Sequence, residues 1–391
     1  MTRSFSVVMK PAGADCNLRC SYCYYLDAAD QYGGPARVHR MTDSILETAI
    51  SGYLSIEQPE YDFEWDGGEP TLAGPEFFRT AVGLQKRHAR RGAKISNRIQ
   101  TNATLIGDEL AAVFAKHGFR VGVSIDGPPD LHDRQRPYES GRGSHAAVMG
   151  GVETLRRHGV EPAALTVITA ETAHHARRIY HYLKSAGFHQ HEYTPCVEFA
   201  ADGSLAPSAV DGDSWGRFLC DLYDEWCADP EPARIAQFDA IMRVAAGVPA
   251  QLCALASTCR QRMVVEHNGD VFPCDFFVKP EYRLGNVAED TFETMWNSPH
   301  FRRFGAMKRT VPEECRDCAY RIYCRGGCPR HRIGNAADPI AAAESSEMPV
   351  GELCSGWRRF FDHALSDLEI KGQVAPDQGM PVAIDTRVIG R

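Results

Sequence analysis

The chain of 391 residues contains 43% hydrophobic and 24% charged residues, with a formal net charge of −8 at pH 7. This length indicates two domains, or one large barrel with an appended domain. No apolar run approaches the roughly 20 residues needed to cross a bilayer, and the N-terminus lacks the pattern of a secretory signal. The acidic balance disfavours nucleic acid, because phosphate binding needs a basic face. We therefore expect a cytoplasmic protein with neither a membrane nor a nucleic-acid partner.

The first half of the chain alternates strand and helix patterns. Runs rich in β-branched and aromatic residues predict strands at 5–12, 61–68, 95–102, 119–127, 163–170 and 190–198. Helical periodicity lies between them, at 41–55, 74–89, 107–118, 144–159 and 173–187. Six such repeats imply a parallel sheet with helices outside it. Because a closed eight-stranded barrel would need two more repeats, we expect an α/β fold of the partial (β/α)6 TIM-like barrel type.

Polar and glycine-containing segments follow several of these strands. They are "DGGEPT" at 66–71, "QTNAT" at 100–104, "SIDGP" at 124–128 and "TPCVE" at 194–198. A loop with three cysteines follows the first strand. Since the carboxyl ends of parallel strands form the mouth of such barrels, we expect these segments to border one pocket. Residues 208–246 are predicted to be helical, with a core stripe made of Trp215, Phe218, Leu219, Leu222 and Trp226.

Fourteen cysteines are unusual for a protein of the reducing cytoplasm, where they indicate metal ligation or catalysis rather than disulfides. The first three, in "GADCNLRCSYCYYLD", are Cys16, Cys20 and Cys23. Eight more lie in the second half: Cys253, Cys259, Cys274, Cys315, Cys318, Cys324, Cys328 and Cys354. The remaining three, Cys196, Cys220 and Cys227, are interpreted as mostly buried thiols without a metal role.

Zinc and iron–sulfur clusters are the two candidates for these cysteines. Zinc explains two four-cysteine sites in the second half, but structural zinc needs four protein ligands and the N-terminal group has three. An iron–sulfur cluster held by three thiolates leaves one iron open for a substrate or cofactor. A zinc-binding adaptor without catalysis stays the alternative, and a colourless, zinc-loaded protein would support it.

The spacing Cys-x3-Cys-x2-Cys, with Tyr22 before the last cysteine, resembles the radical S-adenosylmethionine (SAM) enzymes. "GGEP" at 67–70 resembles the second motif of that family, which binds the amino group of SAM. The later cysteines resemble the SPASM domain, which carries two auxiliary clusters. The resemblance implies three 4Fe–4S clusters and SAM as cofactors. It also implies a radical SAM barrel at 1–235, a SPASM domain at 236–371 and a tail at 372–391.

The same resemblance implies which cysteines hold which cluster. The N-terminal cluster takes Cys16, Cys20 and Cys23. The nearer auxiliary cluster takes Cys253, Cys259, Cys274 and Cys328. The farther one takes Cys315, Cys318, Cys324 and Cys354. The spacing alone does not fix this assignment.

Two stretches, "WDGGEPTLAG" at 65–74 and "GDVFPCDFFVKPEYRLGNV" at 269–287, resemble the anaerobic sulfatase-maturating enzymes. The resemblance runs over residues 5–365 and implies oxidation of a sulfatase Cys or Ser to Cα-formylglycine. In that chemistry a 5′-deoxyadenosyl radical takes a hydrogen from Cβ. The implied partners are a sulfatase polypeptide or a Cys/Ser-x-Pro-x-Arg-like peptide, and an electron donor such as flavodoxin or ferredoxin. The alternative is a SPASM maturase of another ribosomal peptide, forming a thioether or carbon–carbon crosslink or an epimer.

The resemblance also assigns roles to single residues. Asp275 is the expected base, and its alternative role is a structural partner of Arg283 or of a backbone amide. The expected SAM contacts are Tyr22, Gly68, Ser124, Arg136 and the backbone near Val197, with Arg134 an open alternative to Arg136.

Tyr25 and Asp66 are expected to face the peptide. Asp66 departs from the family pattern, which more often has Gln there. A carboxylate at this position would favour a basic residue in the peptide, and it also leaves open a different peptide substrate. The choice between Cys and Ser as the target stays open.

Overall fold

The computed structural model describes residues 4–32, 38–200, 202–334, 339–344 and 349–374. The chain forms two compact units. The first contains Met1–Ser124, Arg136–Pro162 and Arg260–Gly305, and the second contains Ile125–Gln135, Ala163–Cys259 and Ala306–Arg391. These units are defined by packing, and the domain boundaries expected above stay a prediction. Most of the expected tail, residues 375–391, lies outside the described residues.

The first unit contains a mostly parallel sheet. Its strands are β1 (Ser6–Met9), β2 (Glu60–Trp65), β3 (Lys94–Thr101), β4 (Arg120–Ser124), β8 (Arg262–Val265), β9 (Asp270–Phe272) and β10 (Gly285–Asn286). Their order is β10-β9-β8-β1-β2-β3-β4. Strand β8 pairs in parallel with β1, whereas β9 and β10 continue from it antiparallel. Strands β1 to β4 confirm the sequence prediction. Strands β8 to β10 were not predicted, and β9 and β10, with three and two residues, are too short to show a periodic pattern.

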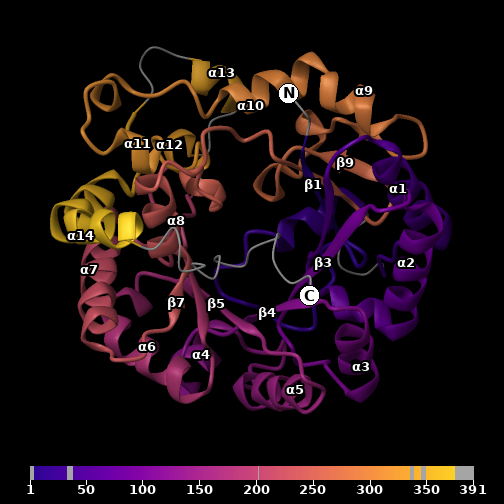
Figure 1. The fold of residues 1–391 in the computed structure, drawn as a ribbon, viewed down its shortest axis with the longest axis horizontal. Helices are drawn as coiled ribbons and strands as arrows, with labels where there is room; N and C mark the ends of the chain where they lie inside the picture. Colours follow the sequence, from indigo (N-terminus) through magenta and orange to yellow (C-terminus); the bar gives the residue numbers. More distant parts are fainter. Residues whose placement is uncertain (1–3, 33–37, 201, 335–338, 345–348, 375–391) are drawn as a thin grey trace. The chain divides into compact units, whose positions relative to one another are not determined.

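Helices cover the outer side of these strands. They are α1 (Asp43–Ser55), α2 (Gly74–His88), α3 (Asp108–Lys116), α5 (His145–Arg157), α9 (Phe292–Asn297) and α10 (Pro299–Ala306). Helices α1, α2, α3 and α5 lie in succession around the unit (Figure 1). The core between helices and strands contains the fully buried rings of Phe63, Trp65, Phe78 and Phe114. Burying each such ring stabilises the fold by about 1.5–3 kcal/mol, which fixes the strand ends that carry the site loops.

The second unit contains three parallel strands, β5 (Ala163–Ile168), β6 (Gln190–Pro195) and β7 (Arg234–Ile235). Its helices are α4 (Pro129–Gln135), α6 (Ala176–Ser185), α7 (Gly212–Ala228), α8 (Ala236–Ala245), α11 (Arg321–Cys324), α12 (Arg330–Ile333), α13 (Pro339–Glu344) and α14 (Cys354–Val374). Four residues of the predicted stripe on α7 are fully buried, Trp215, Phe218, Leu219 and Leu222, whereas Trp226 is half-buried. Strands β5 and β6 and helix α6 also match the predicted segments.

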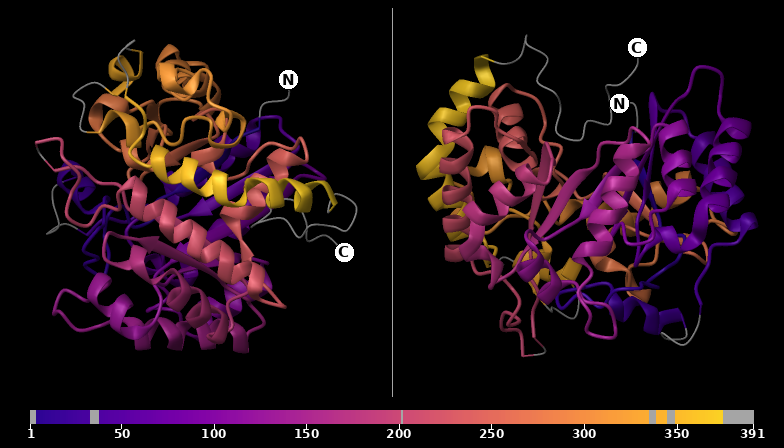
Figure 2. Two further views of the ribbon diagram at one scale, coloured as in Figure 1. Left: turned by 90° about the vertical axis from the view of Figure 1, so that its left-hand side faces the viewer. Right: turned by 90° about the horizontal axis from the view of Figure 1, so that it is seen from below.

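Helix α14 lies alongside α7, as Figure 2 shows. The approach is close because three glycines meet there. A Cβ on Gly356 would lie 2.1 Å from the carbonyl oxygen of Gly212, and one on Gly216 would lie 2.7 Å from Cα of Gly356. Larger residues at these positions would therefore push the two helices apart. Among the described residues, no helix has both the length and the apolar character needed to span a bilayer.

Candidate active site

Three loops of the first unit meet where strands β1, β2 and β8 end. The backbone N–H of Lys10 donates to the carbonyl of Val265 at 2.9 Å, and that of Asp66 donates to the carbonyl of Met9 at 3.0 Å. These bonds carry the parallel pairing one residue beyond the strands. As a result, the cysteine loop, the "DGGEPT" segment and the segment after β8 begin at the same edge of the sheet, as predicted for the first two.

The cysteine loop presents three partly accessible thiols, Cys16, Cys20 and Cys23. Nitrogen donors point at two of the sulfurs. The backbone N–H of Leu18 lies 3.4 Å from Sγ of Cys16, and Nη1 of Arg136 lies 3.9 Å from Sγ of Cys20. Such donors stabilise negative sulfur, so the loop suits three thiolates on an iron–sulfur cluster.

Without a metal, burial raises the pKa of Cys16 to about 12, with further contributions from Glu69, Cys20 and Cys23. Without a metal, repulsion among three neighbouring thiolates disfavours their charged forms. The positive charge of a bound metal offsets this repulsion and keeps the coordinating thiols deprotonated. The donor set therefore fits the cluster that the sequence predicts.

The "GGEP" segment packs directly on the cysteine loop. The backbone N–H of Gly68 donates to the carbonyl oxygen of Gly13 at 2.8 Å, and that of Glu69 donates to the backbone carbonyl oxygen of Asp15 at 2.7 Å. A Cβ at position 68 would lie 2.1 Å from the Asp15 carbonyl oxygen, so this approach requires glycine. The buried Glu69 carboxylate accepts hydrogen bonds from Thr71 and Thr101 and from the backbone N–H of Asn102. Glu69 thus ties the segment to the end of β3, a structural role that the sequence did not reveal.

Four of the five predicted SAM contacts, Tyr22, Gly68, Ser124 and Arg136, lie in the first unit. The Arg136 guanidinium carbon is 5.3 Å from the centre of the Tyr22 ring, so these two residues meet beside the cysteines. Ser124 is buried at the end of β4. Val197 is buried in the second unit, and its relation to the other four stays a prediction.

Asp275 follows Cys274 in a single 3-10 turn, Asp275–Phe277. Its Oδ1 lies 2.9 Å from Nζ of Lys10, which is also 3.8 Å from Oδ2 of Asp66. The Lys10 side chain is 0% exposed, whereas Asp275 is 16% and Asp66 25% exposed. The structure thus brings together the expected base and one expected peptide residue around one buried lysine.

The alternative partner of Asp275, Arg283, pairs instead with Asp270 and Glu289. Within the described residues, Oδ1 of Asp275 accepts no directed hydrogen bond, and its contact with Lys10 is an ion pair. This oxygen is itself buried against Lys10, so the 16% exposure of the Asp275 side chain comes from its other atoms.

Charge interactions stabilise the cluster formed by Lys10, Asp66 and Asp275. Burial disfavours the charged ammonium of Lys10, but the Asp275 and Asp66 carboxylates outweigh burial, so the pKa of Lys10 stands well above its usual value. Burial also raises the pKa of Asp66; Lys10 opposes that shift, and Asp275 adds to it. Two carboxylates competing for one cation leave an excess of negative charge, which suits a basic group on a ligand.

Tyr25 does not present its hydroxyl to solvent. It is 3% exposed, and its hydroxyl donates to the fully buried Glu266. The neighbouring Tyr24 is 39% exposed and packs on Phe276, with ring centroids 4.5 Å apart. Contact of Tyr25 with a peptide stays a prediction, and the structure adds Tyr24 as the more accessible aromatic residue. No sequence pattern distinguished these two adjacent tyrosines.

The second unit holds seven of the eight predicted auxiliary ligands, and Cys274 belongs to the first unit. Cys253, Cys259 and Cys328 are close enough for their charges to interact, as are Cys315, Cys318, Cys324 and Cys354. Two buried cations lie among these thiols. Nζ of Lys308 donates to the carbonyl of Ala254 at 2.5 Å, and Arg332 donates to the carbonyl of Thr310 at 2.6 Å. Both cations favour thiolates and so fit negatively charged clusters.

The three cysteines without a predicted metal role differ in burial. Cys196 is buried, which raises its pKa to about 11, and Cys220 is half-buried. Cys227 is exposed, so the prediction of a buried thiol is wrong there. It lies in the last turn of α7, beyond the part of the helix that packs in the core.

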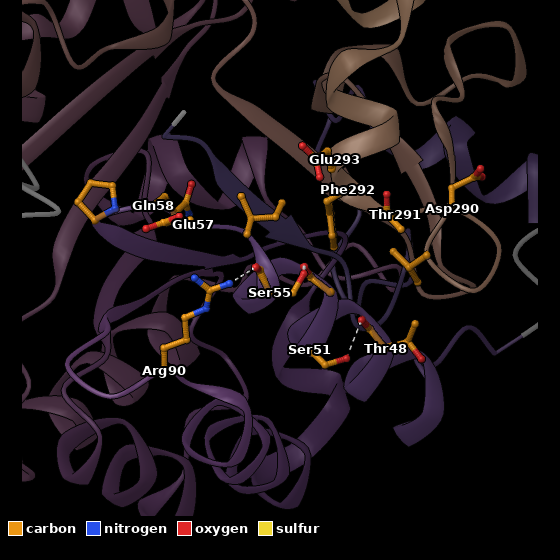
Figure 3. A pocket seen from close by; sticks show the side chains of 14 residues that line it. Thr48, Ser51, Ser55, Glu57, Gln58, Arg90, Asp290, Thr291, Phe292 and Glu293 are labelled. Atoms are coloured by element: carbon orange, nitrogen blue, oxygen red, sulfur yellow. Dashed lines mark hydrogen bonds between the residues drawn. The ribbon is translucent and has the colours of Figure 1, made fainter. Parts of the chain in front are cut away.

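A separate pocket of about 930 Å³ lies in the first unit at the end of α1 (Figure 3). Hydroxyls of Thr48, Ser51 and Ser55 line it, and Arg90 donates to the Ser55 carbonyl at 2.6 Å. None of the predicted site residues lines this pocket, which separates it from the cysteine loop.

Comparison with protein families gives two matches. The radical SAM superfamily matches residues 11–183, and the SPASM iron–sulfur cluster-binding domain matches residues 253–319. The fold and the cysteine loop therefore define a radical SAM enzyme with a SPASM domain, which implies a 4Fe–4S cluster, auxiliary clusters and SAM. The match confirms the predicted fold class and leaves the zinc-adaptor alternative without support.

Individual relatives narrow the family. A serine-type anaerobic sulfatase-maturating enzyme of Bacteroides thetaiotaomicron is 35% identical, covering 97% of this chain and 94% of its own. A cysteine-type enzyme of Clostridium perfringens is 32% identical, covering 93% and 97%. The solved structure of native anSMEcpe with bound AdoMet and Cp18Cys peptide is 30% identical, with a TM-score of 0.86 over 95% of this chain and 100% of that one. The chain belongs to the anaerobic sulfatase-maturating enzymes.

The two arginines left open by the sequence differ in their surroundings. Arg134 is 58% exposed and pairs with Glu171, whereas Arg136 is buried beside Cys20 and Tyr22. We expect Arg136→Gln to weaken SAM binding by about tenfold or more, the usual effect of losing a charged hydrogen bond. The matched variant Arg134→Gln should bind SAM as the wild type does. Equilibrium dialysis of the reconstituted proteins measures both, and the reverse result would assign the contact to Arg134.

Proposed function

We propose that this enzyme converts a Cys or Ser residue of a sulfatase to Cα-formylglycine. Relatives of the chain are named anaerobic sulfatase-maturating enzymes, of both the serine type and the cysteine type. The structural observation that carries the proposal is the Asp275 carboxylate. It is partly exposed, adjacent to a cluster cysteine and free of directed hydrogen bonds within the described residues. A carboxylate so placed can accept the thiol or hydroxyl proton of the target residue.

Different residues of the chain are proposed to hold the cofactors and to accept the proton. Cys16, Cys20 and Cys23 would hold the N-terminal cluster, and Tyr22, Gly68, Ser124, Arg136 and the backbone near Val197 would hold SAM. When bound, these cofactors supply hydrogen-atom abstraction from Cβ, and the auxiliary clusters supply an acceptor for the second electron. Asp275 takes the proton from the target sulfur or oxygen. The auxiliary ligand sets are those expected from the sequence, within a SPASM domain at 236–371 that follows a barrel at 1–235.

The peptide is proposed to bind with a basic residue near Asp66. This carboxylate is 25% exposed and shares the single cation of Lys10 with Asp275, so the pair carries excess negative charge. The arginine of a Cys/Ser-x-Pro-x-Arg peptide has the complementary charge. Tyr25 and Asp66 are the proposed peptide-facing residues. Flavodoxin or ferredoxin is the proposed electron donor, in a cytoplasmic setting.

Mass spectrometry of peptides after anaerobic turnover tests the proposal. The reconstituted enzyme is incubated with SAM, a reductant and peptides that carry Cys-x-Pro-x-Arg or Ser-x-Pro-x-Arg. Formylglycine from Ser has lost two hydrogens, and formylglycine from Cys has also exchanged sulfur for oxygen. We expect an aldehyde that reacts with hydrazine from at least one peptide. SAM cleavage with both peptides unchanged would contradict sulfatase maturation and favour a SPASM maturase of another peptide.

A further inference from the structure

Lys10 is a buried charge that no sequence motif marks. It follows the last residue of β1, and its side chain is 0% exposed. A lysine ammonium in the interior is costly unless opposite charges surround it. Here it has two, Asp275 at 2.9 Å and Asp66 at 3.8 Å, and its ammonium lies 4.2 Å from the centre of the Tyr25 ring.

Lys10 and its two carboxylate partners differ in how much of each side chain is exposed. Lys10 is sealed, but both carboxylates that it holds are partly exposed, at 16% for Asp275 and 25% for Asp66. A ligand can therefore reach the acids and cannot reach the lysine. The backbone of Lys10 is fixed as well, since its N–H donates to Val265 in the pairing of β1 with β8. The buried ammonium of Lys10 therefore holds two carboxylates that are themselves partly exposed.

We propose that Lys10 is a positioning residue for the reaction: its ammonium fixes the Asp275 carboxylate in place for proton transfer, and Asp66 shares the same anchor. The proposal rests on the proposed function for the role of Asp275 as the base and for the identity of the product. The ion pair holds Asp275 through its buried Oδ1, and the 16% exposure of the Asp275 side chain lies on its other atoms. Asp66 bears a like charge beside it, and Lys10 offsets their repulsion.

The test compares kcat and KM of reconstituted holoenzyme variants. Lys10→Met keeps most of the length of the side chain and removes its charge. We expect kcat for product formation to fall by about 10- to 100-fold, the loss typical of a catalytic group displaced by about an ångström. KM for the peptide should change much less than kcat, because Lys10 is out of reach of the peptide and Asp66 keeps its own charge, and SAM cleavage should continue. A raised KM with unchanged kcat would overturn the proposal and place Lys10 in peptide binding.

A second variant separates charge from packing. In Lys10→Met the two carboxylates repel each other without an anchor, so adding Asp66→Asn should restore part of kcat. If Lys10 served only to pack against Tyr25, Asp66→Asn would restore nothing, and that result would overturn the proposal. Lys94→Met is the control, because Lys94 is 76% exposed and pairs only weakly, at 3.4 Å, with Glu60. If Lys10→Met does not accumulate as folded protein, kcat of the double variant Lys10→Met/Asp66→Asn is compared with that of the wild type instead.

A measurement on thermal unfolding does not depend on the product. In a double-mutant cycle of Lys10→Met and Asp275→Asn, the combined loss in Tm should be smaller than the sum of the two single losses, because each change removes the same ion pair. If the two Tm losses were additive, Lys10 and Asp275 would not be coupled, and that result would overturn the proposal. If the wild type makes no formylglycine, the proposed function fails, and this cycle still decides whether Lys10 and Asp275 are coupled.

Discussion

Asp275→Asn should reduce formylglycine formation by about 10²- to 10⁴-fold, the usual contribution of a general base. An amide has the size of the carboxylate but does not accept the proton of the target residue. SAM cleavage should continue in this variant, because the cysteine loop is untouched. Production of 5′-deoxyadenosine without oxidised peptide, measured by liquid chromatography and mass spectrometry, is therefore the expected result.

Asp270→Asn is the matched control for this change. Asp270 lies in the same unit and is 15% exposed, close to the 16% of Asp275, but it pairs with Arg283 rather than with Lys10. We expect Asp270→Asn to form product at a rate similar to the wild type. If both variants lose product equally, the loss reflects the packing of this segment, and Asp275 is not the base.

Cys20→Ala should abolish SAM cleavage. Two thiolates do not retain a cluster that needs three, and the Arg136 guanidinium near Sγ of Cys20 loses its partner at 3.9 Å. Iron content should fall from about twelve to about eight atoms per chain as one of three four-iron clusters is lost. Iron assay and detection of 5′-deoxyadenosine after anaerobic reconstitution measure both effects.

Two cysteine variants complete this experiment. Cys318→Ala removes an expected ligand of the farther auxiliary cluster, so iron should fall while SAM cleavage persists. Cys227→Ala is the control, since Cys227 is an exposed thiol in α7 without a predicted metal role. Cleavage of SAM by Cys20→Ala at the wild-type rate would exclude this loop as the site of the catalytic cluster.

Sequence patterns were sufficient for the repeating part of the fold. Strands β1 to β6 are runs of four to eight residues with β-branched or aromatic side chains, and each lies within or near its predicted range. The short strands β7 to β10 were missed, and β7 lies within the range 208–246 that was predicted to be helical. These short segments become strands only by pairing with neighbouring strands. Their position in the sheet is a tertiary effect that no local pattern encodes.

The candidate site was predictable where it depends on spacing. The cysteine loop and Gly68 are fixed by motifs, and the structure places them in contact through Gly13 and Asp15. Lys10 was not predictable, because a lysine after a strand usually reaches solvent. Its burial depends on tertiary contacts: β1 pairs with β8, and Asp275, Asp66 and Tyr25 lie against its side chain. The same pairing supplies Glu266, which engages the hydroxyl of Tyr25.

Helix α14 has a consequence for the order of biosynthesis. Its first residue is Cys354, an expected ligand of the farther auxiliary cluster, and its Gly356 seats the helix against Gly212 of α7. On the proposed ligand set, the ribosome delivers this last thiolate after all the other cysteines, and docking of α14 brings it into place. Loading of iron at that site therefore waits for the synthesis of Cys354, and the earlier thiols must stay reduced until α14 has docked.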